Sequence, residues 1–416
     1  HLLKWQVQFL GLHIGVHLSF LLLSALYGLS GIWLAKTLLE RDEDRRRTLL
    51  VFSFLWLVAN IRVIRSFLWG TVPEGLAGQY MLGVYYQPCC FGVLLLAGIA
   101  AYISGRSLLA AICFVLAPLF HSAYLISSVL VAASMIVLPA NRARGIGWWT
   151  RLLFLSLVVL PLAIYAVWSW DRLTTGDPLV RNSAHQILAE IRIPHHAIPS
   201  EWNLGSTVLF FLVGLAASWF GRNWLVGQLL FVTLVVVALT VVGAVILHNP
   251  TLAVSAPWRV SVFLAPLSWI ILLAVAAKWL TRALGRHYPI PRVWLTRALV
   301  VAGTLAALAG LLGLVQDYQE KTHKEYYAIS RFLEDYHESG NQYLIPLDQS
   351  YTRLEAGVPV YATWKSHPTK DSEFLEWYER AETVRAIYEG PVEQARQKLL
   401  ALIEDGSVTH LMLSLI

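Results

Sequence analysis

The side chains best suited to chemistry in this 416-residue chain are cations and imidazoles that occur within or beside long apolar segments. Arg62 and Arg65 lie three residues apart in one such segment, Arg259 opens another, and His121 stands at a break between two shorter ones. A charge in hydrocarbon is costly and normally has a partner, yet no Asp or Glu occurs within the apolar segments. Because a guanidinium can hold two phosphate oxygens at once, this pattern predicts that the arginines bind an anionic ligand such as a lipid phosphate.

The arginines also have a structural interpretation that needs no ligand. Arg65 and Arg259 are near segment ends, from which a long side chain can extend to the polar membrane interface. Arg62 is one helical turn deeper, so this alternative fits it less well. Both interpretations remain open at this point.

His121 has two interpretations as well. It follows Pro118, which frees a backbone carbonyl in the preceding helix, and the imidazole could simply bond to that carbonyl. Helix breaks at membrane depth also tend to line cavities, because their unpaired backbone groups need protein or water partners. The second interpretation places His121 in an outward-open cavity with Tyr85, Tyr86 and Arg62.

Two hydrophilic loops, 70–88 and 171–203, supply the remaining candidates near the membrane. Glu74 is a carboxylate that could activate a hydroxyl group, and His121 is the second candidate for a catalytic residue. The candidate substrate contacts are Tyr85, Tyr86, Gln87, His195 and His196. For each of these, ordinary loop polarity is the alternative.

Several kinds of chemistry are not indicated by the sequence. Adjacent histidines such as His195 and His196 make a weak two-ligand metal site, and the three cysteines, Cys89, Cys90 and Cys113, lack metal-ligand spacing. No phosphate-binding glycine loop, serine-hydrolase motif or zinc-protease motif is present. We therefore predict no cofactor, and a divalent metal, although compatible with the chemistry, is not indicated.

The composition predicts a membrane protein. Hydrophobic residues make up 57% of the chain and charged residues only 14%, whereas soluble domains carry about a quarter charged residues. The apolar residues form long uncharged runs, as a bilayer-spanning helix of about 20 residues requires. We predict an all-α domain of about ten membrane segments, one pair short or re-entrant, at 12–38, 48–69, 89–104, 107–138 (the pair), 152–170, 204–221, 224–247, 259–281 and 298–315.

The charge distribution predicts two domains and an orientation. Residues 1–315 hold 22 Lys and Arg against 9 Asp and Glu, and residues 316–416 hold 10 against 17. The basic loops of the first part are cytoplasmic by the positive-inside rule, so no nucleic acid is needed to explain them. Counting segments then puts loops 70–88, 171–203 and 248–258, and residues 316–416, on the outer side of a bacterial inner membrane.

Residues 316–416 are predicted to form a small soluble α/β domain. Strands are expected at 342–347, 358–363 and 408–415, and helices at 317–339, 372–388 and 392–403. Arg353 and Lys365 lie beside the second strand, at the kind of place where α/β layers hold ligands. Because the sequence begins at His1 and ends in an apolar stretch, we expect a fragment trimmed at both ends.

Two groups of motifs resemble a known family. Tyr85-Tyr86-Gln87-Pro88 precedes Phe120-His121-Ser122-Ala123-Tyr124, and far downstream come Trp364-Lys365-Ser366-His367-Pro368 and Glu376-Trp377-Tyr378-Glu379-Arg380. This combination resembles an uncharacterised bacterial family of multi-span membrane proteins with a C-terminal soluble module. The architecture in turn is similar to that of the C-type glycosyltransferases.

The second resemblance implies an enzyme that takes a sugar from a polyprenyl phosphate donor on the outer face. C-type glycosyltransferases carry an acidic residue in their first outer loop, which would lie upstream of His1, so Glu74 is the only nearby substitute here. Two other functions stay open, a lipid or polysaccharide transporter and a non-catalytic scaffold of the cell envelope. The predicted partner is a membrane lipid, namely a polyprenyl-phosphate-linked sugar, whereas a scaffold would display its soluble module to a partner in the cell envelope. The oligomeric state is not predicted.

Overall fold

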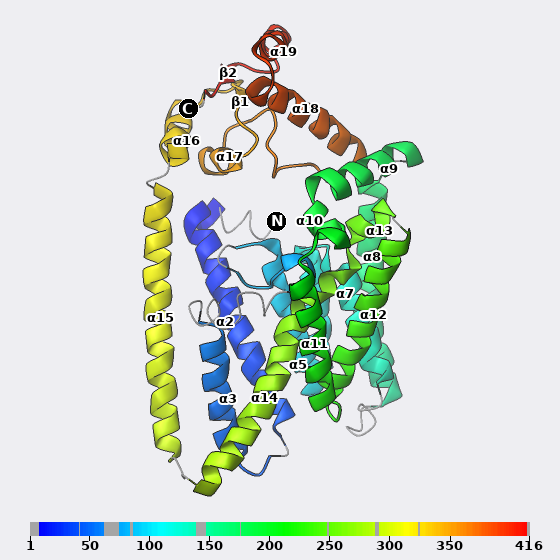
Figure 1. The fold of residues 1–416 in the computed structure, drawn as a ribbon, viewed down its shortest axis with the longest axis vertical. Coiled ribbons are helices and arrows are strands. Elements are labelled where there is room, and N and C mark those ends of the chain that lie inside the picture. Colours follow the sequence, from blue (N-terminus) through cyan, green and yellow to red (C-terminus); the bar gives the residue numbers. More distant parts are fainter. Residues whose placement is uncertain are drawn as a thin grey trace. The chain divides into compact units, whose positions relative to one another are not determined.

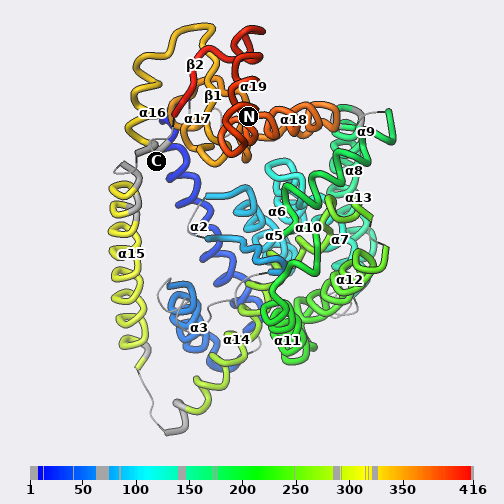
Figure 2. Tube along the Cα trace, turned by 45° about the horizontal axis from the view of Figure 1, so that its top comes forward, coloured from blue at the N-terminus to red at the C-terminus, as the bar shows by residue number. Residues whose placement is uncertain are grey.

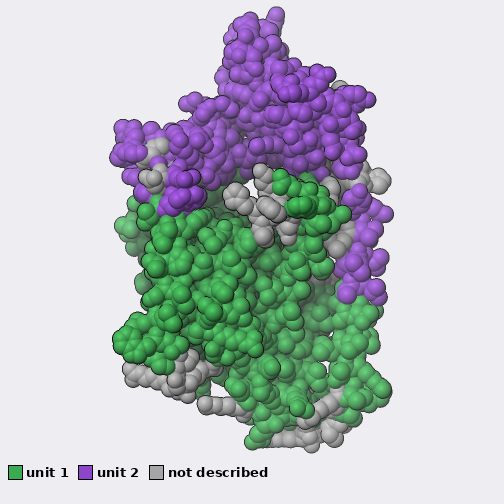
Figure 3. All heavy atoms as spheres, turned by 180° about the vertical axis from the view of Figure 1, so that it is seen from behind, with its two compact units in different colours: residues 1–167, 188–306 green, residues 168–187, 307–416 purple. Residues whose placement is uncertain are grey.

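The computed structural model describes residues 8–40, 42–61, 75–83, 86–138, 147–174, 176–247, 249–287, 291–322 and 325–413. Four of the predicted site residues, Arg62, Arg65, Glu74 and Tyr85, lie outside these described residues. The chain divides into two compact units (Figure 3). Unit 1 comprises residues 1–167 and 188–306, and unit 2 comprises residues 168–187 and 307–416.

The regular secondary structure in the described parts of unit 1 is entirely helical (Figure 1). Every predicted membrane segment contains a helix, because long apolar runs without charge or repeated glycine favour one. The helices are α2 (Leu12–Leu38), α3 (Arg45–Ala59), α5 (Val93–Ile103), α6 (Ser107–Phe120), α7 (Tyr124–Val137), α8 (Trp148–Leu173), α11 (Leu204–Phe220), α12 (Leu225–Leu247), α13 (Pro250–Ser255), α14 (Ser261–His287) and α15 (Arg292–Thr322), of which α8 and α15 continue into unit 2.

Five apolar stretches among the described residues are long enough to cross a membrane: Ile14–Leu38, Trp148–Trp170, Leu225–Leu247, Pro250–Ala283 and Val293–Glu320. Four shorter apolar helices accompany them, at Pro88–Ile103, Ser107–Phe120, Tyr124–Val137 and Leu204–Phe220. The chain is therefore built as a membrane protein.

Helices α14 and α5 are largely buried in unit 1, where α2 runs beside α5 (Figure 2). Helix α14 packs against α3, α11 and α12. In the apolar stretch Pro250–Ala283, 72% of the residues in the most apolar 18-residue part are buried. Helix α5 is almost entirely buried and packs against α6 and α2. Gly98 permits this approach, because a Cβ at this position would lie 2.9 Å from the Phe114 ring.

The short pair predicted at 107–138 is confirmed as two helices with a break between them. Helix α6 contains Pro118 and ends at Phe120, and His121 is extended with φ −148° and ψ 104°. The His121 N–H donates to the Ala117 carbonyl, and the His121 carbonyl accepts from the Tyr124 N–H that begins α7. These bonds fix the backbone of the break, and the His121 ring meets the Tyr124 ring edge-on at a centroid distance of 5.6 Å.

Unit 2 combines a small parallel sheet with helices α16 (Glu325–Tyr336), α17 (Ser350–Ala356), α18 (Asp371–Glu389) and α19 (Val392–Glu404). Strand β1 (Tyr343–Leu344) pairs in parallel with β2 (His410–Leu411), and a further parallel bridge joins Tyr343 to Val360. The three predicted strand segments are thus hydrogen-bonded neighbours. The ladders are far shorter than predicted, so helices account for most of this unit.

Unit 2 also contains helix α9 (Pro178–Ile187), which belongs to the long loop after α8. Helix α9 packs against α18. The imidazole Nε2 of His185 lies 3.6 Å from a carboxylate oxygen of Asp371, whose side chain is 7% exposed. This contact joins the loop to the first turn of α18.

Candidate functional site

Arg259 is positioned by a short 3-10 turn, η6 (Pro257–Val260), directly before α14. Ala256 adopts a left-handed conformation with φ 40°, and its carbonyl accepts a hydrogen bond from the Arg259 N–H. Trp258 is fully buried and fixes the turn to the core. The Arg259 guanidinium therefore starts from a rigid backbone position and is half-buried.

Four residues from three other segments lie within electrostatic range of the Arg259 guanidinium: Cys89, His121, Tyr124 and His196. In the part of the chain that the structure describes, no Asp or Glu pairs with Arg259. A buried or half-buried cation is costly to desolvate unless a counter-charge lies beside it. An anion at this position would offset that cost.

Tyr124 and Cys89 connect the break after α6 to the chain around residue 88. The Tyr124 hydroxyl donates a hydrogen bond of 2.5 Å to the Cys89 carbonyl. The break continues into an aromatic stack, in which the Phe91 and Phe120 rings have centroids 4.5 Å apart. Tyr86 meets Phe91 edge-on at 6.3 Å, so Tyr86 and His121 border one aromatic group.

His196 reaches the cluster on a one-turn helix, α10 (Pro194–Ala197). The indole of Trp258 donates a hydrogen bond of 3.0 Å to the His196 carbonyl, and Trp202 packs edge-on against Trp258 at 5.3 Å. Burial, and then the nearby His195 and Arg259, lower the pKa of His196 to about 4. His196 is therefore neutral at pH 7, and its imidazole adds no positive charge to the cluster.

Among the described residues, three buried polar atoms of this region have no hydrogen-bond partner: Tyr86 Oη, His196 Nδ1 and Trp202 Nε1. Burial raises the pKa of Tyr86 to about 12, so its hydroxyl keeps its proton. Buried polar groups are nearly always hydrogen-bonded, and leaving one without a partner costs about 1–3 kcal/mol. Protonated tyrosine and indole N–H groups are donors, as is Arg259, so oxygen atoms of an anion are suitable partners.

Of the predicted site residues, His121 and His196 lie within electrostatic range of Arg259, and Tyr86 packs against Phe91. Gln87 is adjacent, where its amide donates to the Tyr80 hydroxyl at 3.2 Å. His195 is exposed, with its ring 4.1 Å from that of His196.

Sequence reasoning did not assign Tyr124, Trp202 or Trp258 to the site. In the sequence, each of them is only an aromatic residue beside a predicted break or loop. Aromatic residues are common at membrane interfaces, so this position does not indicate a site.

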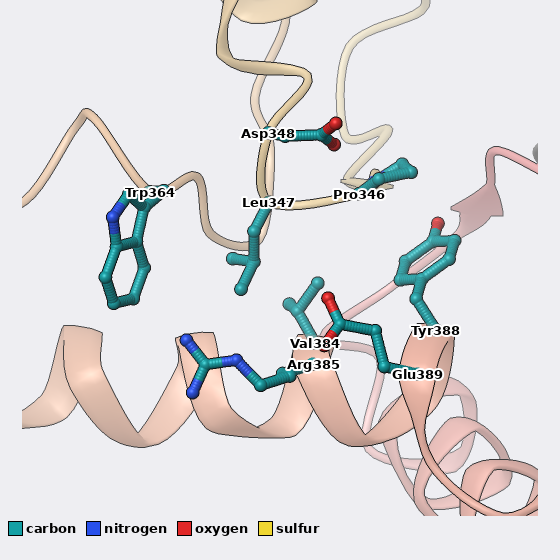
Figure 4. Close-up of a pocket in the computed structure, with 8 residues that line it drawn as sticks. All are labelled: Pro346, Leu347, Asp348, Trp364, Val384, Arg385, Tyr388 and Glu389. Carbon is teal, nitrogen blue, oxygen red and sulfur yellow. The ribbon is translucent and has the colours of Figure 1, made fainter.

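Arg353 and Lys365 belong to unit 2 and are exposed there. The Lys365 ammonium lies over the Tyr351 ring, 5.3 Å from its centroid. Neither residue lines the pocket of about 250 Å³ that the same unit contains (Figure 4). The pocket lining includes charged residues that the sequence did not indicate, namely Asp348, Arg385 and Glu389.

The described residues contain no group of three or more His, Cys, Asp or Glu side chains that could hold a metal ion.

Comparison with known proteins gives one match. The family model described as "Domain of unknown function (DUF6798)" matches residues 324–384, which include α16, β1, α17 and most of α18. No curated protein matches the chain, and no solved structure matches it. The segment 324–384 of the C-terminal unit is thus similar to a family whose function is unassigned.

Proposed function

We propose that this chain is a bacterial inner-membrane protein whose outer-face cluster around Arg259 binds the phosphate of a lipid, and that it transfers a sugar from a polyprenyl phosphate donor. The observation that carries the proposal is the half-buried Arg259 guanidinium, which has no carboxylate partner among the described residues. Guanidinium geometry suits a phosphate. The lipid phosphate would neutralise the positive charge of Arg259, and its oxygen atoms would accept hydrogen bonds from the nearby donors that lack a partner.

The proposed architecture has about ten membrane segments, with the short pair α6 and α7 re-entering the membrane or crossing it tightly. The C-terminal residues 316–416 form an extracytoplasmic α/β domain. This arrangement is supported by the helix found in each predicted segment and by the Lys and Arg content of the loops. It places Arg259, His121 and His196 on the outer side.

In the proposed reaction, an acceptor hydroxyl attacks the anomeric carbon of the donor sugar. The bond between that carbon and the phosphate oxygen breaks, and polyprenyl phosphate leaves. Arg259 stabilises the negative charge that grows on the leaving oxygen. Glu74 is the proposed base that takes the hydroxyl proton, and His121 is the second catalytic candidate.

Native mass spectrometry of the full chain with polyprenyl phosphate, and with uncharged polyprenol as the control lipid, tests the proposal. We expect the phosphate lipid to bind at least tenfold more tightly than polyprenol, and Arg259→Gln to remove the difference. Arg259→Lys should restore part of it, because an ammonium lacks the bidentate fork. Equal binding of both lipids to the wild type would contradict a phosphate-binding site at Arg259.

The release of polyprenyl phosphate from a polyprenyl-phosphate sugar then separates an enzyme from a transporter or scaffold. An enzyme releases the lipid phosphate only when an acceptor is present. Tight binding of the donor without release would leave the lipid site standing and contradict the transferase assignment.

A further inference from the structure

The pocket of unit 2 lies where the parallel strands end. Pro346, Leu347 and Asp348 follow β1, Trp364 follows the bridge at Val360, and α18 supplies the remaining wall. Ligands of α/β layers usually bind beyond the carboxyl ends of strands, where loops of different strands converge. The position of this pocket is thus that of a ligand site.

The walls of the pocket are held by hydrogen bonds that do not involve a ligand. The backbone N–H of Trp364 donates a hydrogen bond of 3.0 Å to the Leu347 carbonyl and thereby joins the two loops. The Tyr388 hydroxyl lies 2.9 Å from the Leu344 carbonyl oxygen and 2.8 Å from that of Met412, which ties α18 to the sheet. Such preformed walls reduce the ordering cost of binding.

The lining of the pocket is half apolar and half polar or charged. Leu347 and Val384 point toward one another at its centre (Figure 4), where Val384 is fully buried. Trp364 and Arg385 lie on one side of them, and Tyr388 and Glu389 on the other. Apolar surface beside placed polar groups is the usual composition of a small-molecule site.

The charged groups define what the pocket can accept. Arg385 forms an ion pair with Glu382 and lies over the Trp364 ring, which fixes its orientation. Only one N–H of its guanidinium is used in that hydrogen bond, and a guanidinium has five. The carboxylates of Asp348 and Glu389 form no ion pair within the described part of the chain, and ionised carboxylates are acceptors only.

We propose that this pocket binds a neutral, hydroxyl-rich ligand, a single sugar ring, with Asp348 and Glu389 accepting from its hydroxyl groups and Arg385 donating to a hydroxyl oxygen. The two carboxylates disfavour an anion, whereas a sugar offers both donors and acceptors together with apolar C–H faces for Leu347 and Trp364. The volume of about 250 Å³ is below the range of about 300–1,000 Å³ for drug-sized ligands, which suits one ring. This inference does not depend on lipid binding at Arg259.

The test is saturation-transfer NMR of the full chain in nanodiscs with methyl glucoside, methyl mannoside and methyl N-acetylglucosaminide as probes. We expect saturable transfer from at least one of them, weakened at least tenfold in Asp348→Asn and in Glu389→Gln. Glu379→Gln is the matched control, because Glu379 is exposed on the same helix and does not line the pocket. It should bind as the wild type does.

Arg259→Gln separates this inference from the proposed function, since it should leave sugar binding unchanged. Absence of saturable transfer from all three probes in the folded protein would overturn the proposal. Equal affinity in the pocket variants and the control would overturn it as well. If glucosamine bound far more tightly than the methyl glycosides through the same two carboxylates, the pocket would be an ammonium site and the assignment to neutral sugars would be wrong.

Discussion

The indole N–H of Trp258 donates a hydrogen bond to the backbone carbonyl of His196, which lies 62 positions earlier in the chain. Trp258 is fully buried, and the next residue is Arg259. The bond therefore fixes the segment that carries His196 to the turn that carries the guanidinium. Two segments of unit 1 that are far apart in the sequence are thus held together.

Trp258→Phe should lower both thermal stability and lipid affinity. The substitution leaves the His196 carbonyl without its donor, which costs about 1–3 kcal/mol if no water replaces the indole. A thermal melt of the protein in nanodiscs and the polyprenyl phosphate titration measure the two effects. Trp279→Phe is the control, because Trp279 lies on α14 and is 68% exposed, and it should change neither. An unaltered melt and titration for Trp258→Phe would show that the bond does not organise the site.

The low pKa of His196 predicts a pH dependence of stability. The pKa is about 4 in the folded protein, where burial disfavours the charged imidazole, and about 6.5 in the unfolded chain. Between about pH 4 and pH 6.5 the unfolded chain binds this proton more readily than the folded protein does. Protonation of His196 therefore does not lower the free energy of unfolding above about pH 6.5, and lowers it progressively as the pH decreases toward 4. Melting temperatures measured at pH 7.5 and 5 check this, and His196→Gln should make the loss smaller. The same loss in the variant would assign the effect to other groups.

His121→Ala should weaken lipid binding with little effect on stability. The His121 backbone makes the hydrogen bonds that shape the break, and the ring touches Tyr124 edge-on at 5.6 Å. Since alanine keeps the backbone bonds, we expect a melting temperature within a few degrees of the wild type and an affinity reduced about tenfold. Ser122→Ala, at the adjacent exposed position, is the control. A large loss of melting temperature with intact binding would make His121 a structural residue.

Orientation is tested by cysteine labelling in intact cells. Glu338 is exposed in unit 2, and a cysteine there should react with a membrane-impermeant thiol reagent once the outer envelope is permeabilised. A cysteine at Arg144, which lies outside the described residues, should be protected until the inner membrane is opened. The wild type, with Cys89, Cys90 and Cys113, gives the background. The reverse pattern would place the C-terminal unit in the cytoplasm.

The helices could be predicted because the physical signal is local. A long uncharged apolar run predicts a helix by itself, and Pro118 followed by His121 predicts the break between α6 and α7. In unit 2, helices were predicted at 372–388 and 392–403, and α18 and α19 occupy Asp371–Glu389 and Val392–Glu404.

The contacts between distant segments could not be predicted in the same way. Nothing local in residues 178–187 shows that they pack on α18, since that depends on the contact of His185 with Asp371. The strands were overestimated because an apolar run shows burial but not how far a ladder extends. The association of Tyr124 and Trp202 with Arg259, and of Asp348 with Arg385, likewise depends on packing between distant parts of the chain.

A structure of the full chain in nanodiscs with polyprenyl phosphate bound tests the central claim most directly. The account predicts phosphate oxygens about 3 Å from the Arg259 guanidinium nitrogens, within hydrogen-bond distance, and on the side of the guanidinium that faces Tyr124 and His196. A phosphate bound elsewhere, with the Arg259 guanidinium instead paired to a carboxylate of the protein, would contradict it.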